Sequence, residues 1–514
     1  MRSADPAAQS VTLPAGVTSP WRIVTPHLAN IVMVFAAIAI RLSVPIDANI
    51  DWLMTNCRRF LAGAHLYKDI VETNPPMAIF IYLPAAVVER FTGWPAEGVY
   101  TVMVLAAAIT SALVFCRLVR PLVPDPRTWR VLEAAVLFAL VVAPLSAFGE
   151  REHAALILTL PILGLAARRA AGLHVAVPVL VMTGLAAGIA PMIKPHFALG
   201  IVAAYLFMAI RRRNLLLLAA PEAVLAAAAV AVYAGLVAHF IPAYGHEVMP
   251  LLFDLYQPLG LPLAERLLSF KTLAWTASVI CLGAGIRGRL FEPVTGTLVA
   301  ASAGFLLVLI LQGRDWPYHA YSAVALMFMA VPPAILPALL SGDPKQRVPA
   351  IAAAVAACVH LGYFTGFGYG GSGVVAPIRA AVTAPTIMSI SFDLTPGHPI
   401  TTQTHGTWVG IYSSRWITVN ASYLRTTTHD PVRLARLERW LAYDRAVTNR
   451  DLAKRPDIVL VGLGPFGWQD WIAADPTTQR LMAGYVPLAR DELTPKQRER
   501  YEGIAAFIRR DLVK

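Results

Sequence analysis

Long apolar runs separated by short polar segments dominate the first 370 residues of the chain. A transmembrane helix needs about 20 mostly apolar residues. Twelve segments approach that length: 27–45, 77–92, 96–117, 131–148, 154–168, 174–193, 197–210, 215–241, 271–286, 294–312, 319–340 and 349–368. The pattern predicts a polytopic α-helical membrane protein.

Basic clusters in the loops predict the orientation of these segments, because cytoplasmic loops carry an excess of Lys and Arg. Twelve spans with a cytoplasmic N-terminus would leave several clusters outside. Segment 77–92 is short, follows Pro75 and Pro76 and contains Pro84, so we expect an interfacial or re-entrant helix there. About eleven transmembrane helices then place every cluster in the cytoplasm: Arg117 to Arg130, Arg168 and Arg169, Arg211 to Arg213, Arg287 and Arg289, and Lys345 and Arg347.

The two ends of the chain differ from its middle. Residues 1–26 are polar, unlike a cleaved signal peptide, and are expected to form a cytoplasmic tail. The transmembrane domain covers 27–370, with a first external loop at 46–95. In 376–514 the apolar runs shorten to strand length between helix-like stretches, which predicts a C-terminal α/β domain on the extracytoplasmic side.

Composition agrees with a membrane protein and excludes other classes. Hydrophobic residues make up 57% of the 514 residues and charged residues 14%, against about 25% charged in soluble domains. The formal net charge of +12 lies in short clusters between apolar runs, so it marks topology and excludes nucleic acid as a partner. The four cysteines predict neither a disulfide framework nor a zinc cluster.

A glycine-rich run, GFGYGGSG at 366–373, separates the last apolar segment from the C-terminal region. It lacks the preceding strand, the lysine and the Ser/Thr of a phosphate-binding loop. We therefore interpret it as a flexible linker.

Acidic, histidine and isolated basic residues gather in the loops of the external face: 46–76, 149–153, 194–196, 242–270 and 313–319. Ionisable groups at a membrane are costly and are usually functional. Their restriction to one face predicts a membrane-embedded active site there.

Three of these loops supply candidate ligand-binding residues. In GEREH (149–153) we expect Arg151 to bind an anionic group such as a phosphate and an acid to hold a hydroxyl group of the ligand, with Glu150 peripheral; a solvated loop with local ion pairs is the alternative. The complete set from the three loops is Arg151, Glu152, His153, Lys194, His196, Arg314, Asp315, Tyr318 and His319. Lys194 would be a phosphate counter-ion or a snorkelling side chain, and GRDWPYH (313–319) would be a site loop or an aromatic belt.

The segment after the first span has a distinctive order of residues. Asp47 lies at the mouth of the span, and Asp51 precedes a run with helical periodicity, where it is expected to be an N-cap. Gly63, Tyr67, Asp69, Glu72 and Asn74 follow before the double proline.

This order resembles the first external loop of the GT-C superfamily of membrane glycosyltransferases, in particular the protein O-mannosyltransferase, aminoarabinose transferase and RgtA/B/C/D-like group. The resemblance covers roughly 27–370 and implies a catalytic acidic pair in this loop and a polyprenyl-phosphate sugar donor. The family usually has a contiguous Asp-Glu, whereas this chain has Asn49-Ile50 between Asp47 and Asp51. Either aspartate could be the base; we favour Asp51, because a helix N-terminus stabilises a carboxylate.

The resemblance implies a hexosyl or pentosyl transferase of the plasma (inner) membrane that acts on its extracytoplasmic face, with an aspartate base and inversion at the sugar. The acceptor would be an envelope glycan, lipid or protein, and membrane lipids would surround the protein. We expect Asp69, Glu72 and Asn74 to contact substrate, and the C-terminal domain, with Trp408, Arg415 and Trp416, to cover the site or select the acceptor. The sequence requires no cofactor and leaves a divalent metal open.

Two other functions remain open. A transporter or flippase would place ionisable residues near the bilayer midplane and show internal repeats, and no repeat is evident in the sequence. A non-catalytic assembly protein would depend on its external domain and tolerate substitution of the loop acids.

Overall fold

The computed structural model describes residues 28–44, 46–314, 316–340, 343–363, 373–395, 397–491 and 502–513. The predicted tail at 1–26 lies outside the described residues, as does the predicted linker up to residue 372.

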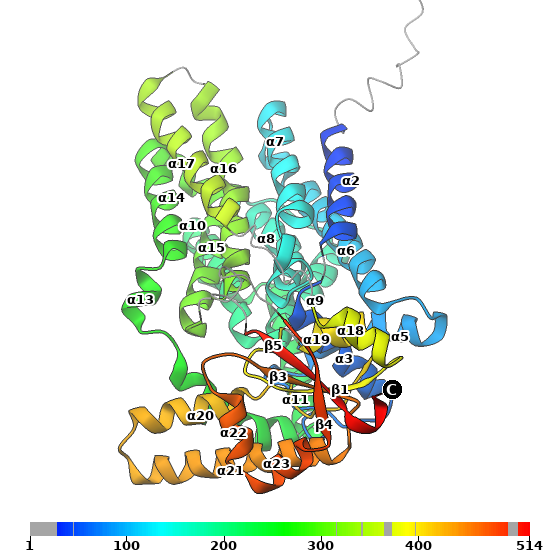
Figure 1. Ribbon diagram of the computed structural model, residues 1–514. Helices are drawn as coiled ribbons and strands as arrows, with labels where there is room; N and C mark the ends of the chain where they lie inside the picture. Colours follow the sequence, from blue (N-terminus) through cyan, green and yellow to red (C-terminus); the bar gives the residue numbers. More distant parts are fainter. Residues whose placement is uncertain are drawn as a thin grey trace, which may run out of the picture.

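Long helices run side by side in a bundle that forms the larger part of the molecule (Figure 1). Each of the eleven predicted spans contains a helix: α2 (Leu28–Ser43), α6 (Ala96–Val119), α7 (Pro126–Leu137), α8 (Arg151–Ala170), α9 (Val177–Ile193), α10 (Ala198–Arg212), α11 (Pro221–Phe240), α14 (Phe270–Ile286), α15 (Pro293–Gln312), α16 (Tyr321–Leu340) and α17 (Pro344–Tyr363). By length and composition, five described helices could cross a membrane, or six if α2 is counted together with the helix that follows it. The number of spans therefore stays a prediction.

Segment 77–92, which the loop charges exclude from the spans, forms two short helices. These are α4 (Met77–Phe80), of 4 residues, and α5 (Leu83–Thr92), of 10 residues. Both are far shorter than a membrane span, in agreement with an interfacial segment. They lie beside α3 (Ala48–Leu61), which is bent by 75° from α2.

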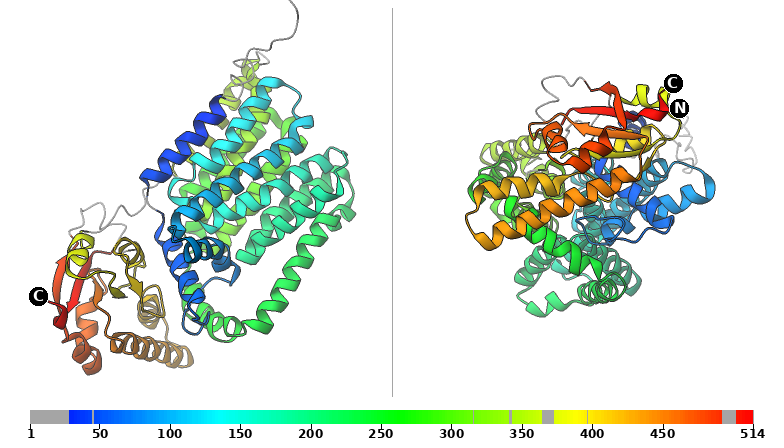
Figure 2. Two further views of the ribbon diagram at one scale, coloured as in Figure 1. Left: turned by 90° about the vertical axis from the view of Figure 1, so that its right-hand side faces the viewer. Right: turned by 60° about the horizontal axis from the view of Figure 1, so that its bottom comes forward.

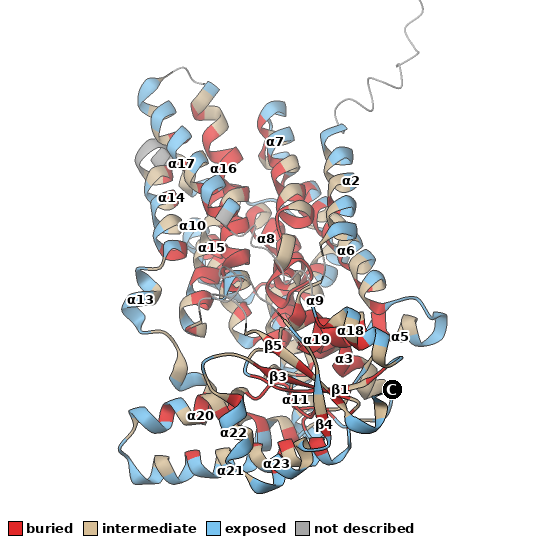
Figure 3. Ribbon diagram, viewed as in Figure 1, coloured by how far each residue is buried: buried red, intermediate tan, exposed pale blue. Residues whose placement is uncertain are grey.

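Helix α8 lies in the middle of the bundle and is buried along most of its length (Figure 3). Its apolar residues face neighbours on all sides, whereas α11 is mostly exposed, as expected for a lipid-facing helix. The polar start of α8, Arg151-Glu152-His153, is buried as well. It lies at the end of the bundle where the predicted external loops meet.

The C-terminal region folds around a five-stranded mixed sheet in the order β2-β1-β3-β5-β4. The strands are β1 (Thr386–Ile390), β2 (Thr407–Trp408), β3 (Ile458–Gly462), β4 (Tyr485–Arg490) and β5 (Ile504–Arg509). Strand β1 pairs in parallel with β2 and β3, and β5 pairs antiparallel with β3 and β4. The apolar run Ile-Val-Leu-Val of β3 is buried throughout, as is typical of a strand covered on both faces.

Helices pack around this sheet: α18 (Val375–Ala381), α19 (Gly397–Gln403), α20 (Trp416–Thr427), α21 (Pro431–Ala453), α22 (Trp468–Ala473) and α23 (Pro476–Met482). Figure 2 shows this α/β unit at one end of the bundle, next to α3. It therefore lies at the same end as the polar start of α8.

Candidate active site

Helix α3 begins at Asp47, which places this residue at the helix N-terminus. The Asp47 carboxylate accepts a hydrogen bond from the backbone N–H of Asn49 at 2.9 Å, so Asp47 is the N-cap. The prediction that Asp51 caps the helix is wrong, because the helix starts earlier and Asp51 lies within its first turn.

The two aspartates have different neighbours. Asp51 is buried near Glu97 of α6 and Arg58 of its own helix, and burial together with the Glu97 charge raises the pKa of Asp51 well above its ordinary value. Asp47 lies next to Glu150 and Arg151, and both residues influence the pKa of its carboxyl group. Of the two candidate bases, Asp47 is thus the one beside the polar start of α8.

Glu150 and Arg151 form the first half of the site. Arg151 Nη2 lies 3.5 Å from Glu150 Oε2, and both side chains are buried. Burial raises the pKa of Glu150 well above its ordinary value, and the carboxyl of Asp47 raises it further. Burial also raises the pKa of Asp47, while the hydrogen bond from the backbone of Asn49 and the charge of Arg151 lower it. The expectation that Glu150 is peripheral is wrong: the turn before α8 directs it toward Asp47.

Lys194 and Glu152 form the second half of the site. Lys194 Nζ lies 2.7 Å from Glu152 Oε1 and donates to Gln312 Oε1 at 3.2 Å. His319 Nε2 is 3.7 Å from the same Glu152 oxygen. Lys194 is only 7% exposed, so it does not snorkel, and burial lowers its pKa while Glu152 raises it. Three loops that are distant in the sequence therefore meet at one carboxylate.

Several buried polar atoms around these two halves have no hydrogen-bond partner among the described residues. They are Glu150 Oε1 and Oε2, Arg151 Nε, Glu152 Oε2, His196 Nε2 and Gln312 Nε2. Buried polar groups are normally paired, and an unpaired one costs about 1–3 kcal/mol. Their concentration at one place is what a site for a polar ligand requires. Tyr318 closes the same region, since its hydroxyl accepts from Asn49 Nδ2 at 3.4 Å.

His153 has a structural role. Its Nδ1 accepts from the backbone N–H of Gly149 at 3.0 Å, so Nε2 carries the proton and donates to the Leu140 carbonyl at 2.9 Å. Both ring nitrogens are engaged by backbone, which leaves no ring nitrogen for a ligand. His153 instead fixes the turn at Gly149, whose φ of +80° is accessible mainly to glycine.

The other predicted residues of the first external loop lie apart from this cluster. Glu72 accepts hydrogen bonds from Trp52 Nε1 and from the backbone and side chain of Asn74, so its carboxylate holds the loop together. Asp69 is exposed and pairs with His65 at 3.0 Å. Neither geometry supports the predicted substrate contact. Asp315, also a predicted site residue, lies outside the described residues.

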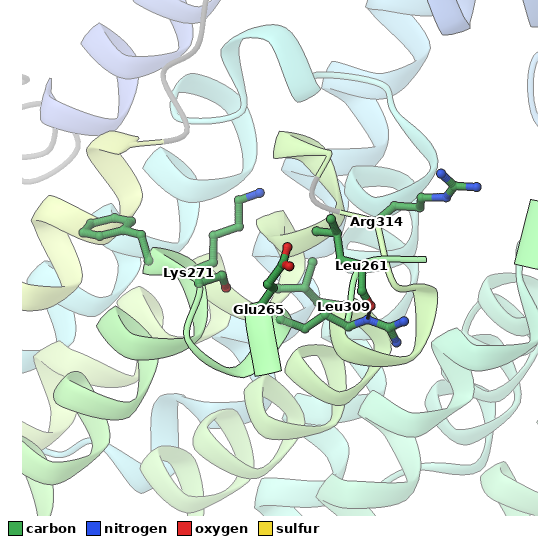
Figure 4. Close-up of a pocket in the computed structure, with 8 residues that line it drawn as sticks. Leu261, Glu265, Lys271, Leu309 and Arg314 are labelled. Atoms are coloured by element: carbon green, nitrogen blue, oxygen red, sulfur yellow. Dashed lines mark hydrogen bonds between the residues drawn. The ribbon is translucent and has the colours of Figure 1, made fainter. Parts of the chain in front are cut away.

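A pocket of about 250 Å³ is lined in part by Arg314, which lies two residues after Gln312 in the sequence (Figure 4). Its lining residues are Leu261, Glu265, Arg266, Ser269, Phe270, Lys271, Leu309 and Arg314. Arg314 stacks on the ring of Tyr256 at 4.3 Å and donates to the Tyr256 carbonyl at 2.7 Å. Sequence reasoning missed Arg266 and Lys271, although Arg266 lies in the external segment 242–270 and Lys271 directly follows it, outside the cytoplasmic basic clusters.

The described part of the chain contains no evident metal-binding site. No group of three or more His, Cys, Asp or Glu side chains is arranged there to hold an ion. Instead, Glu150 pairs with Arg151 and Glu152 pairs with Lys194.

Comparison with known proteins gives structural likenesses. The fold is similar to that of ArnT from Cupriavidus metallidurans bound to undecaprenyl phosphate, at 14% identity and a TM-score of 0.47, covering 95% of this chain and 98% of that chain. It is also similar to the archaeal oligosaccharyltransferase AglB from Archaeoglobus fulgidus in complex with an inhibitory peptide and a dolichol-phosphate, at 12% identity and a TM-score of 0.46, covering 95% and 75%. No protein-family model and no curated protein sequence matches the chain.

Proposed function

We propose that the protein transfers a sugar from a polyprenyl-phosphate carrier to an acceptor hydroxyl of the cell envelope, on the extracytoplasmic face of the membrane. The observation that carries the proposal is the cluster of half-buried Asp47 with the buried Glu150 and Arg151, beside Glu152 and Lys194, at one end of a bundle of apolar helices. Such a cluster can remove a proton and stabilise an anion at the membrane surface, which is what this reaction needs.

In the proposed reaction Asp47 is the general base. Its carboxylate takes the proton of the acceptor hydroxyl as the hydroxyl oxygen bonds to the anomeric carbon of the sugar. The bond from that carbon to the phosphate oxygen breaks, and the electron pair leaves with the polyprenyl phosphate. Because the sugar is displaced once, its anomeric configuration inverts.

The cationic pocket is the proposed site of the donor phosphate. The residues that line the pocket include three bases, Arg266, Lys271 and Arg314, and one acid, Glu265. Leu268 and Leu311, next to the pocket, are exposed and offer an apolar surface to a prenyl chain. A guanidinium can bind phosphate oxygens with two parallel hydrogen bonds, which makes Arg314 the key contact.

Replacing Arg314 with Gln is expected to raise the KM for the lipid donor about tenfold or more, since one charge-assisted contact to the phosphate is lost. Steady-state kinetics with a polyprenyl-phosphate sugar would measure this. Arg425→Gln, which removes an exposed ion pair with Glu438 in the α/β domain, is the matched control and should leave the KM unchanged. An unchanged KM in Arg314→Gln would place the phosphate elsewhere.

The pH dependence of transfer should depend on Glu150. Asp47 acts only when ionised, so transfer falls as the pH drops through its raised pKa. We propose that protonated Glu150 donates a hydrogen bond to the neighbouring Asp47 during the reaction, which would lower the pKa of Asp47. Glu150→Ala removes this donor and should move the acid limb of the pH profile to higher pH, whereas Glu150→Gln keeps a donor and should leave it in place. An acid limb that stays fixed in Glu150→Ala contradicts this pairing.

Glycan profiling of a deletion strain tests the function in the cell. We expect one envelope sugar to disappear and its lipid-linked donor to accumulate, with both changes reversed by the wild-type gene. A transporter or flippase is the second candidate. If the protein is a flippase, the donor should be trapped on the cytoplasmic side in the deletion strain. If it is an assembly protein, deleting the α/β domain alone should abolish function, while substitution of every loop acid should be tolerated.

A further inference from the structure

The α/β domain contacts both sides of the candidate active site. One side is the α3 wall (residues 47–72), which begins with Asp47. The other is the Tyr256 wall (residues 252–257), which supports Arg314 of the phosphate pocket. These contacts arise from two separate surfaces of one small domain.

The Tyr256 wall is held mainly through Asp254. Its carboxylate pairs with Arg436 at 2.8 Å and accepts from Trp440 Nε1 at 3.0 Å. Asn420 Nδ2 donates to the carbonyl of Leu255 at 3.4 Å. The next residue is Tyr256, on which the guanidinium of Arg314 is stacked. The domain thus fixes the backbone that positions Arg314.

The α3 wall is held through the segment 408–411. Arg59 Nη1 donates to the carbonyl of Gly410 at 2.6 Å, and the backbone N–H of Val71 donates to the carbonyl of Ile411 at 3.0 Å. The ring of Trp52 lies 4.8 Å from that of His398. Helix α3 and the loop after it therefore contact the α/β domain through hydrogen bonds to backbone carbonyls and through a contact between aromatic rings.

A buried ion cluster carries this contact into the domain. The backbone N–H of Ile411 donates to Asp451 at 3.2 Å, and Arg415 lies between Asp451 at 3.1 Å and Asp444 at 3.3 Å. All three ionic side chains are fully buried. Arg415 is therefore not a ligand contact, in contrast to the role in covering the site or selecting the acceptor expected from the sequence; it links segment 408–411 to α21.

Both contacts end on one helix, α21. Arg436 and Trp440 hold the Tyr256 wall, while Asp444 and Asp451 hold the segment that contacts the α3 wall. At about 100° per residue these four positions lie within about 80° of one another, on one face of the helix. At a rise of about 1.5 Å per residue, the first and last are about 22 Å apart along its axis.

We propose that α21 is a strut that fixes the separation of the two walls, and that Asp254 is a positioning residue for the proposed transfer reaction. The inference rests on the proposed function for its catalytic meaning. The proposed general base, Asp47, lies on the α3 wall, and the proposed phosphate-binding residue, Arg314, is supported by the Tyr256 wall. The alignment of these two side chains therefore depends on the element that joins the two walls. A misplacement of about 1 Å can cost about a hundredfold in rate.

Charge exchange across the contact tests the strut. Asp254→Arg opposes Arg436 and is expected to lower kcat about tenfold or more, with the KM for the donor changed less than about threefold, because Arg266, Lys271 and Arg314 are all still present to bind the phosphate while their alignment with the base is lost. Arg436→Asp should have a similar effect, and the double variant Asp254→Arg/Arg436→Asp should recover most of the lost kcat. Arg425→Ala, which opens a surface ion pair with Glu438 on the same helix α21, should leave kcat unchanged.

Hydrogen exchange provides a readout that does not depend on activity. In Asp254→Arg we expect faster exchange of the amides of 252–257, and slowing again in the double variant. Wild-type protein without transfer activity would overturn the proposed function, while faster exchange would still support the strut. If the wild type is active but Asp254→Arg changes neither kcat nor hydrogen exchange, the strut proposal alone is overturned. The same holds if Asp254→Arg lowers kcat only in proportion to its loss of folded protein.

Discussion

Replacing Asp47 with Asn is expected to reduce sugar transfer by about 10²- to 10⁴-fold, the usual contribution of a general base. Asparagine keeps the side-chain oxygen that caps α3, since Asn and Asp are equally good N-caps. The helix should therefore still begin at residue 47, and the loss would report the missing proton acceptor. Initial rates with a polyprenyl-phosphate sugar and an envelope extract measure the effect.

Asp51→Asn is the matched control for this variant, four residues along the same helix. Burial and the charge of Glu97 raise the pKa of Asp51, which favours its neutral form, and asparagine resembles that form. We expect less than about a tenfold loss of transfer, far below the loss expected for a general base. If Asp51→Asn loses more than Asp47→Asn, the assignment of the base must be reversed.

Replacing Lys194 with Met is expected to lower the free energy of unfolding by about 3–5 kcal/mol, because it leaves Glu152 as an unpaired charge in a buried site. The reason is the contact of 2.7 Å between two side chains that are both almost fully buried. Unfolding of the purified protein in detergent, followed by intrinsic fluorescence, measures the change.

The double variant Lys194→Met/Glu152→Gln tests the cause of this loss. Removing the stranded charge should recover most of the stability, although not the activity. Arg425→Ala, which opens an exposed ion pair, should cost no more than about 1 kcal/mol. A double variant as unstable as Lys194→Met would show that packing, not charge, accounts for the effect.

The sequence predicted which loops meet, but not which atoms face one another. The alternation of basic clusters assigned 149–153, 194–196 and 313–319 to one face, and Glu152, Lys194 and His319 do lie together. The pairing of Asp47 with Glu150 joins the starts of α3 and α8, about 100 residues apart in the sequence. Local patterns carry no signal for such a pairing, so Glu150 was expected to be peripheral.

Local rules also failed where tertiary contacts decide the role of a side chain. Asp51 precedes an apolar periodic run, which is typical of an N-cap, yet the helix extends back to Asp47 because Ala48 and Ile50 are buried as well. His153 resembles a ligand in a polar motif, but its ring completes two backbone hydrogen bonds. Arg415 resembles a surface base between aromatic residues, and only the fold brings Asp444 and Asp451 to it.

The central claim is covalent transfer from a lipid phosphate, and one measurement addresses it directly. Purified protein in proteoliposomes would be given a polyprenyl-phosphate sugar labelled in the sugar, together with an envelope extract. We predict that the label becomes covalently attached to an acceptor, with one equivalent of polyprenyl phosphate released for each sugar transferred, and that Asp47→Asn abolishes both. Label that only crosses the membrane while still attached to its lipid, at the same rate in wild type and Asp47→Asn, would contradict the claim.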